Sequence, residues 1–227
     1  MKPKTLHDTD EQCMLIAEDL PASSLFAKFQ RVIADIAGVY PRAVLVGAAA
    51  AAQYIGSSNN PRITRDVDIL LEEKDFSDFL EDEIPLETLT ALERYFDDSD
   101  SANHSLKHKG TGIYVDLLSL ESRPIRKNMI RHILENRKTA TNRLKVQGRF
   151  IDILKPEYLI AMKLNRFSKK PGSERGQCDR VDILKLLKAL GESLIAADHE
   201  IIKKVCNRNE AACYIKLLDD FETSKCE

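Results

Sequence analysis

The distribution of hydrophobic residues changes at Lys155-Pro156, and this change constrains the fold more than any other feature of the sequence. Before it, short apolar segments of strand type alternate with amphipathic helical segments. After it, hydrophobic residues follow helical spacing only, over 156–168, 177–190, 198–206 and 209–221. We therefore predict an α+β fold, in which residues 1–154 form a mixed sheet flanked by helices and residues 155–227 form a helical bundle.

The first 154 residues contain several segments of strand type. They are predicted at 43–46, 66–71, in a hairpin over 105–120 with its turn at 109–112, and at 143–146 and 149–154 around Gln147-Gly148. Helices are predicted at 21–38 with Gly38 as the stop, in the alanine run after Gly47, over 73–97 with a break near Pro85, and at about 124–137. Strands and helices therefore interleave throughout this half.

The bulk properties exclude several classes of protein. The formal net charge of −2 gives no global basic field, so a nucleic acid would have to meet a local patch, for which Lys169–Arg175 is a candidate. The five scattered cysteines form no disulfide or zinc pattern and are predicted to be reduced thiols. The N-terminus lacks the apolar segment of a signal peptide, and no apolar run reaches the ~18 residues of a membrane helix. We expect a cytoplasmic protein with no membrane partner.

The strand Asp66-Val-Asp68-Ile-Leu carries the first candidate for chemistry. Side chains alternate across a strand, so both carboxylates leave the same face. Two neighbouring anions repel, and a divalent cation would remove that cost. Magnesium prefers such oxygen ligands and takes substrate phosphates as further ligands. An isolated Asp-x-Asp is also common on exposed edge strands, so this motif needs support from its context.

Two further residues supply that context. Asp116 interrupts a second apolar strand, Ile113-Tyr-Val-Asp116-Leu-Leu, and offers the third carboxylate that a pair of metal ions shares. Gly47 directly follows the strand Ala43-Val-Leu-Val46 and opens a helix, where backbone amides and the helix dipole form a phosphate site. The P-loop and dinucleotide-binding glycine motifs are both absent.

Taken in order, these motifs resemble the nucleotidyltransferase superfamily related to DNA polymerase beta. The shared pattern is a strand, a glycine and a helix, then Arg62-Ile-Thr64-Arg-Asp66-Val-Asp68, then three later apolar residues followed by Asp116. Within this superfamily the chain is most similar to the AbiEii-type toxins, because Pro156-Glu-Tyr-Leu-Ile-Ala-Met-Lys163 is followed by Asp179-Arg-Val-Asp182. The resemblance covers about residues 43–190 and implies a nucleotidyltransferase-type mixed sheet.

The resemblance also implies roles for individual residues. Gly47 and Ala48 would bind the triphosphate, and Asp66, Asp68 and Asp116 would bind two Mg²⁺ ions. Further residues of the nucleotide site would be Arg62 and Thr64 beside the metal strand, Lys163 and Arg166 on the following helix, and Asp179 and Asp182, which either orient those cations or lie near the acceptor. Lys163 would act with the three metal-binding acids in catalysis.

The chain departs from the family at one position. The family usually has Gly-Gly or Gly-Ser where this chain has Gly47-Ala48, and alanine offers phosphate only its backbone amide. The main hypothesis is a magnesium-dependent nucleotidyltransferase that moves a nucleotide from an NTP, such as ATP, to RNA, a tRNA end, a protein hydroxyl or a small molecule. As an AbiEii-type toxin it would have a cognate antitoxin as its partner. The alternatives are a nucleotide-binding regulator or antitoxin without catalysis, and a metal-dependent phosphohydrolase or nuclease.

Overall fold

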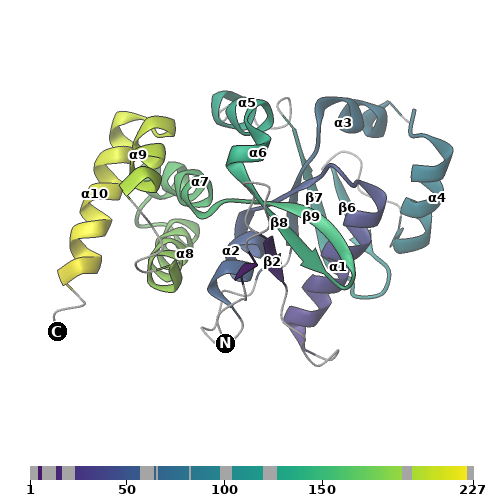
Figure 1. Cartoon of the computed structure of the whole chain (residues 1–227), viewed down its shortest axis with the longest axis horizontal. Coiled ribbons are helices and arrows are strands. Elements are labelled where there is room, and N and C mark those ends of the chain that lie inside the picture. Colours follow the sequence, from purple (N-terminus) through teal and green to yellow (C-terminus); the bar gives the residue numbers. More distant parts are fainter. Residues whose placement is uncertain are drawn as a thin grey trace. The chain divides into compact units, whose positions relative to one another are not determined.

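The computed structural model describes residues 5–6, 14–16, 24–56, 64, 66–81, 83–97, 104–119, 127–190 and 196–223. The chain forms two compact units. The first comprises Met1–Ala50 and Ile63–Leu154, and the second comprises Ala51–Arg62 and Lys155–Glu227 (Figure 1). Among the described residues, no helix is both long and apolar enough to cross a membrane. The mixed sheet and helices confirm the predicted α+β class.

In the described residues of the first unit, nine strands form one mixed sheet in the order β1-β2-β8-β9-β3-β4-β7-β6-β5. Their bounds are β1 Thr5–Leu6, β2 Met14–Ile16, β3 Val44–Val46, β4 Asp66–Leu70, β5 Phe96–Asp97, β6 Ser105–His108, β7 Tyr114–Leu118, β8 Thr141–Val146 and β9 Arg149–Leu154. β3 is antiparallel to β4 and parallel to β9, and β4 is parallel to β7. The sequence did not predict β1, β2 or β5, which are only two or three residues long.

The helix α1 (Leu25–Val39) packs against one face of this sheet, where it contacts β4, β8 and β9. Ser24 caps the helix because its hydroxyl accepts the amide of Ala27 at 3.1 Å. The helix runs one residue beyond the predicted stop at Gly38 and ends before Pro41, since a proline disfavours helical backbone in the residue that precedes it. Gly38 instead makes room for the guanidinium of Arg149, which would overlap a Cβ at that position.

The remaining helices of the first unit connect the strands. α2 (Gly47–Ile55) begins in the first unit, directly after β3, and its residues from Ala51 onward belong to the second unit. The predicted break near Pro85 separates α3 (Glu73–Leu80) from α4 (Leu86–Tyr95), and the predicted helix at 124–137 contains α5 (Lys127–Glu135), followed by α6 (Arg137–Ala140). The hairpin of β8 and β9 turns at Gln147 and Gly148, which both have positive φ, as a two-residue type I′ turn requires.

The second unit contains the helices α7 (Pro156–Lys169), α8 (Glu174–Leu190), α9 (Ala196–Val205) and α10 (Arg208–Thr223). α7 is central, because it contacts the other three. Asn207 and Glu210 form a capping box at the start of α10, in which each side chain accepts the other residue's backbone amide at 3.0 Å. These helices begin within a few residues of the predicted positions, and no strand interrupts them in the described residues.

Candidate active site

The register of the sheet places three acids on one face of β4 and β7. Asp68 is paired directly with Asp116 on the neighbouring strand, and Asp66 lies two residues from Asp68. All three side chains are half-buried, whereas Val67, Ile69 and Val115, which point to the other face, are fully buried. Neighbouring strands lie about 4.8 Å apart, so the carboxylates of Asp68 and Asp116 start from adjacent backbone positions.

Gly47 touches this group of acids from the junction of β3 and α2. Its φ is +70°, a conformation that other L-residues rarely adopt. A Cβ at this position would lie 1.9 Å from Oδ2 of Asp68. Two independent constraints therefore require glycine: the backbone turn between strand and helix, and the space that the Asp68 carboxylate occupies. The sequence indicated the turn, but the contact with Asp68 depends on the antiparallel pairing of β3 and β4.

The neighbours of these residues are placed as follows. Thr64 precedes β4, and its hydroxyl donates a hydrogen bond to Oδ1 of Asp66. Ala48 is 8% exposed, in the first turn of α2. Arg62, the predicted phosphate ligand, lies outside the described residues. Thr64 therefore orients one of the candidate metal ligands, which is a more specific contact than the flanking position predicted for it.

The donor set of this face suits a hard cation, because it consists of carboxylate oxygens on two paired strands. Within the described residues, however, no three His, Cys, Asp or Glu side chains converge into a metal-binding group. The strand register brings the backbones of Asp66, Asp68 and Asp116 together, and their carboxylates would have to turn towards an ion to share it. The residues fit Mg²⁺ in chemistry and in position along the strands.

The remaining predicted residues form a cluster inside the second unit. Lys163 of α7 is 6% exposed, and its Nζ lies 2.7 Å from Oδ2 of Asp182 and 3.9 Å from Oδ1 of Asp179. Arg166 binds Asp179 with two donors, Nε and Nη2, the latter at 2.7 Å. Both acids are buried on α8. Each carboxylate is thus matched by a cation from α7, and the cluster ties these two helices together.

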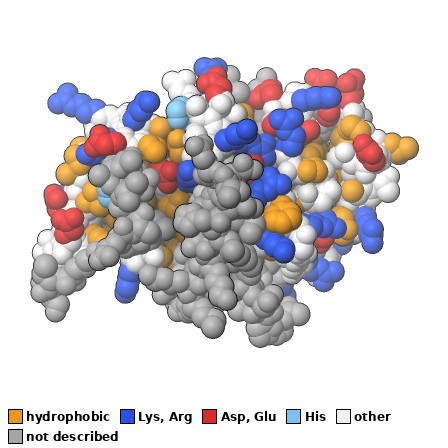
Figure 2. Space-filling view, in the orientation of Figure 1, with side chains coloured by type: hydrophobic (Ala, Val, Ile, Leu, Met, Phe, Trp, Pro, Cys, Tyr) orange, Lys and Arg blue, Asp and Glu red, His pale blue; other side chains and the backbone are white. Residues whose placement is uncertain are grey.

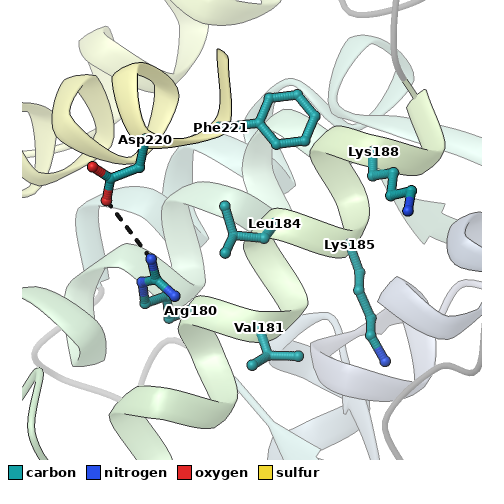
Figure 3. A pocket seen from close by; sticks show the side chains of 7 residues that line it. All are labelled: Arg180, Val181, Leu184, Lys185, Lys188, Asp220 and Phe221. Carbon is teal, nitrogen blue, oxygen red and sulfur yellow. Dashed lines mark ion pairs between the residues drawn. The ribbon is translucent and has the colours of Figure 1, made fainter. Parts of the chain in front are cut away.

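A shallow groove in the same unit lies between α8 and α10 (Figure 3). Val181, Leu184 and Phe221 form its apolar lining, and Lys185 and Lys188 flank it. Its one acid among the described lining residues, Asp220, is paired with Arg180 at 3.7 Å. The groove therefore lacks the group of acids that a metal-dependent reaction needs, and we place the candidate site on the sheet face of the first unit.

That sheet face carries two exposed aromatic residues that the sequence did not single out. Tyr114 of β7 pairs with Asp66, and Phe150 of β9 lies two residues before Asp152, which pairs with Val44 of β3. A strand alternates between faces, so both rings share the face of the three acids. In the sequence, both aromatic residues stand at strand positions where a polar side chain is expected. Only the order of the strands shows that they share a face with the acids.

Comparison with known proteins tests the fold. No protein-family model and no curated protein matches the sequence. Among solved structures, an antigenic nucleotidyltransferase-like protein from Paracoccidioides brasiliensis matches 87% of this chain and 91% of its own, with a TM-score of 0.57 and 16% identity. The antibiotic-resistance factor ANT(2'')-Ia matches 88% of this chain and 98% of its own, with a TM-score of 0.46 and 10% identity. The first of these matches identifies a nucleotidyltransferase-like fold, and the AbiEii-type resemblance stays a prediction.

Proposed function

We propose that this protein is a magnesium-dependent nucleotidyltransferase whose active site is the face of β4 and β7. An acceptor hydroxyl oxygen attacks the α-phosphorus of an NTP, and the bond between this phosphorus and the bridging oxygen to the β-phosphate breaks. The hydroxyl proton passes to a carboxylate, and pyrophosphate leaves. The observation that carries the proposal is the direct pairing of Asp68 with Asp116, with Asp66 on the same half-buried face and Gly47 against Asp68.

Each residue of the candidate site has a proposed role that follows from its position. Asp66, Asp68 and Asp116 would hold two Mg²⁺ ions, which when bound would neutralise the triphosphate and stabilise the leaving pyrophosphate. Asp68 and Asp116 are the candidates to accept the proton, because they are directly paired across β4 and β7 and a carboxylate is a suitable base for an acceptor hydroxyl bound at this face. Thr64 fixes the orientation of Asp66 through its hydrogen bond. The backbone amides that follow Gly47 at the start of α2 are placed to accept phosphate oxygens.

Lys163 and Arg166 contribute by a different route in this proposal. Their charged groups are engaged by the buried Asp182 and Asp179. To bind the triphosphate, Lys163 would have to leave an ion pair of 2.7 Å in a buried site, which is costly. We therefore assign Lys163 first to the stability of the helical unit, and a direct role in nucleotide binding is the second possibility.

One observation favours a second candidate function, a nucleotide-binding regulator without turnover. Ala48 stands where a glycine or serine is usual in the resembling family, and its methyl side chain offers a phosphate no hydroxyl. The pairing of Asp68 with Asp116 beside Asp66 favours the transferase over this alternative, since three carboxylates on one face can hold the two metal ions that nucleotide transfer uses. The role of an AbiEii-type toxin with an antitoxin partner is supported by the motifs at Lys163 and Asp179 to Asp182.

The experiment that tests the proposal is nucleotide transfer from α-labelled NTPs. The protein is incubated with each of the four NTPs, Mg²⁺ and a cell extract as the source of acceptors, and label is followed into macromolecules and small molecules. We expect Mg²⁺-dependent incorporation that is lost in Asp66→Ala. The absence of transfer from every NTP, or transfer that persists in Asp66→Ala, would overturn the proposal. Calorimetric binding of an NTP without any transfer would support the regulator instead.

A further inference from the structure

Tyr114 lies beside the candidate active site and exposes its ring. It is 47% exposed and is the direct neighbour of Asp66 across β4 and β7. Lys107, at the paired position on β6, places its ammonium 6.0 Å from the centre of the ring. This pair of side chains suits a nucleotide. A nucleobase can stack on the exposed ring of Tyr114, and a phosphate can bind the ammonium of Lys107.

A second aromatic residue with the same surroundings lies across the sheet on β9. Phe150 is 41% exposed, and Lys145 is its partner in register on β8. The guanidinium of Arg143 and the ammonium of Lys145 lie 5.7 and 5.9 Å from the centre of the ring. Figure 2 shows Lys and Arg side chains around an exposed hydrophobic group in the region of β8 and β9.

The two cations beside Phe150 are held differently. Arg143 donates to Oδ1 of the buried Asp152 at 2.9 Å, and Arg137 donates to Oδ2 of the same carboxylate at 2.5 Å. Asp152 therefore fixes the direction of Arg143, and the guanidinium retains further donors for a phosphate. Lys145 is exposed and forms no ion pair with any described residue.

The two clusters and the three acids belong to the same face of the sheet, because side chains alternate along each strand. Val44, Leu70 and Asp152, which lie between Phe150 and Asp68 on this face, are buried. Asp152 pairs with Val44 on β3, which pairs with Leu70 on β4, so Phe150 and Asp68 are two strands apart and four positions out of register. Strand geometry gives a separation of about 16 Å. Tyr114 is adjacent to the acids on their other side. Tyr114 thus borders the acids directly, and Phe150 lies farther along the same side of the sheet. A nucleic acid that reached both rings would pass over the residues that cover the buried middle part of this face.

We propose that the acceptor of this enzyme is a single-stranded nucleic acid that lies across the carboxylate face, stacks its bases on Tyr114 and Phe150 and pairs its phosphates with Lys107, Arg143 and Lys145. The inference rests on the proposed nucleotide transfer, because it names the acceptor of the same site. An acidic protein surface would be attracted by the same cations, but it gives the two exposed rings no planar partner to stack on. A duplex has its bases stacked internally and fits the rings equally poorly.

The test is binding of fluorescein-labelled 20-mer oligonucleotides, followed by fluorescence anisotropy at several salt concentrations. Single-stranded RNA, single-stranded DNA and an RNA duplex are compared. We expect wild-type protein to bind single strands more tightly than the duplex, and we expect Phe150→Ala and Tyr114→Ala each to raise the Kd about tenfold or more. Tyr114→Phe keeps the ring and should retain binding. Lys145→Ala should lower the slope of log K against log salt by about 0.7.

Two matched controls separate this face from the rest of the surface. Leu86→Ala removes an exposed apolar side chain from α4, and Lys28→Ala removes an exposed cation from α1, which packs on the opposite face of the sheet. Both should leave the Kd within about twofold. Absence of oligonucleotide binding by wild-type protein, or binding that Phe150→Ala, Tyr114→Ala and Lys145→Ala leave unchanged, would overturn the inference.

The same variants distinguish a failure of this inference from a failure of the proposed function. Asp68→Asn should bind the single-stranded oligonucleotide at least as tightly as wild type and transfer nucleotide to it at least about 100-fold more slowly. Nucleotide transfer to a protein or small molecule that is unaffected in Phe150→Ala would refute the nucleic-acid acceptor and leave the transferase standing. Oligonucleotide binding through these residues without transfer from any NTP would refute the transferase and retain the nucleic-acid face.

Discussion

The two units each contain a group of acids, and the two groups have different surroundings. In the second unit, Asp179 and Asp182 are buried between two helices and paired with cations from α7. In the first unit, Asp66, Asp68 and Asp116 lie half-exposed on neighbouring strands, and Thr64 donates to Asp66 with a neutral hydroxyl. Removal of one partner from a buried ion pair is costly to stability, whereas half-exposed carboxylates on two paired strands offer oxygen ligands that a hard cation can reach. Substitutions in the two groups should therefore affect different properties.

The largest difference should come from Asp68→Asn. This change preserves the shape of the side chain and removes one charge from the candidate metal site, so nucleotide transfer should fall at least about 100-fold. The variant should remain folded, because Asn fills the same space as Asp at this half-exposed position. Transfer rates and thermal unfolding of the same preparation measure both effects. Asp97→Asn, at the exposed position of the edge strand β5 in the same sheet, is the control and should change neither by much.

Lys163→Met should have the opposite pattern, with a large loss of stability. It leaves the buried carboxylate of Asp182 without its cation, and removal of one partner from a buried ion pair costs about 3–5 kcal/mol of the free energy of unfolding. Urea unfolding measures this loss. Lys169→Met removes an exposed lysine from the end of the same helix and should cost about 0.5 kcal/mol or less. A stable Lys163→Met protein with impaired nucleotide binding would instead assign Lys163 to the triphosphate.

Gly47→Ala tests the contact that joins the phosphate site to the acids. The added Cβ would overlap Asp68, and the positive φ adds strain of about 1–3 kcal/mol. Gly148→Ala is the matched control: its φ is +80°, and nothing lies within 4 Å of its Cβ, so it reports backbone strain alone. We expect Gly47→Ala to be the more destabilising change in urea unfolding and to lose nucleotide binding. Equal losses for the two variants would contradict the contact with Asp68.

The smallest effect concerns Asp75, an acid of the first unit outside both groups. Its pKa is raised by burial and by the charges of Glu72 and Asp78, while Arg42 and Lys74 lower it. A raised pKa in the folded state penalises the ionised form, so the penalty is absent below the ordinary pKa of about 3.9 and develops as pH rises through the folded value. Asp75→Asn should therefore raise the melting temperature at pH 7, and this gain should shrink towards pH 4. A gain that is independent of pH would contradict the assignment.

Much of this organisation could be predicted from local patterns. The hairpin at 105–120, the turn at Gln147-Gly148, the break near Pro85 and the change to helices after Lys155 all follow from the spacing of hydrophobic residues and from turn residues. The very short strands β1, β2 and β5 have too few residues to show a period, and they exist because neighbouring strands pair with them.

The features that required the structure all depend on pairing between distant segments. β9 lies beside β3, although about a hundred residues separate them in the chain, and this neighbour relation places Phe150 on the face of Asp68. The sequence located a basic patch at Lys169–Arg175, whereas the aromatic residues with adjacent cations lie on β6–β7 and β8–β9. The burial of Lys163 likewise depends on packing between α7 and α8, which the helical periodicity of either segment does not specify.

The measurement that tests the central claim most directly is calorimetric binding of a non-hydrolysable NTP analogue, with and without Mg²⁺, to wild-type protein and to Asp68→Asn. If the face of β4 and β7 is the metal and triphosphate site, wild-type protein binds the analogue only with Mg²⁺, and Asp68→Asn loses this binding while it remains folded. Binding of equal affinity to both proteins, or binding to wild type that does not depend on Mg²⁺, would contradict the claim that these acids form the active site.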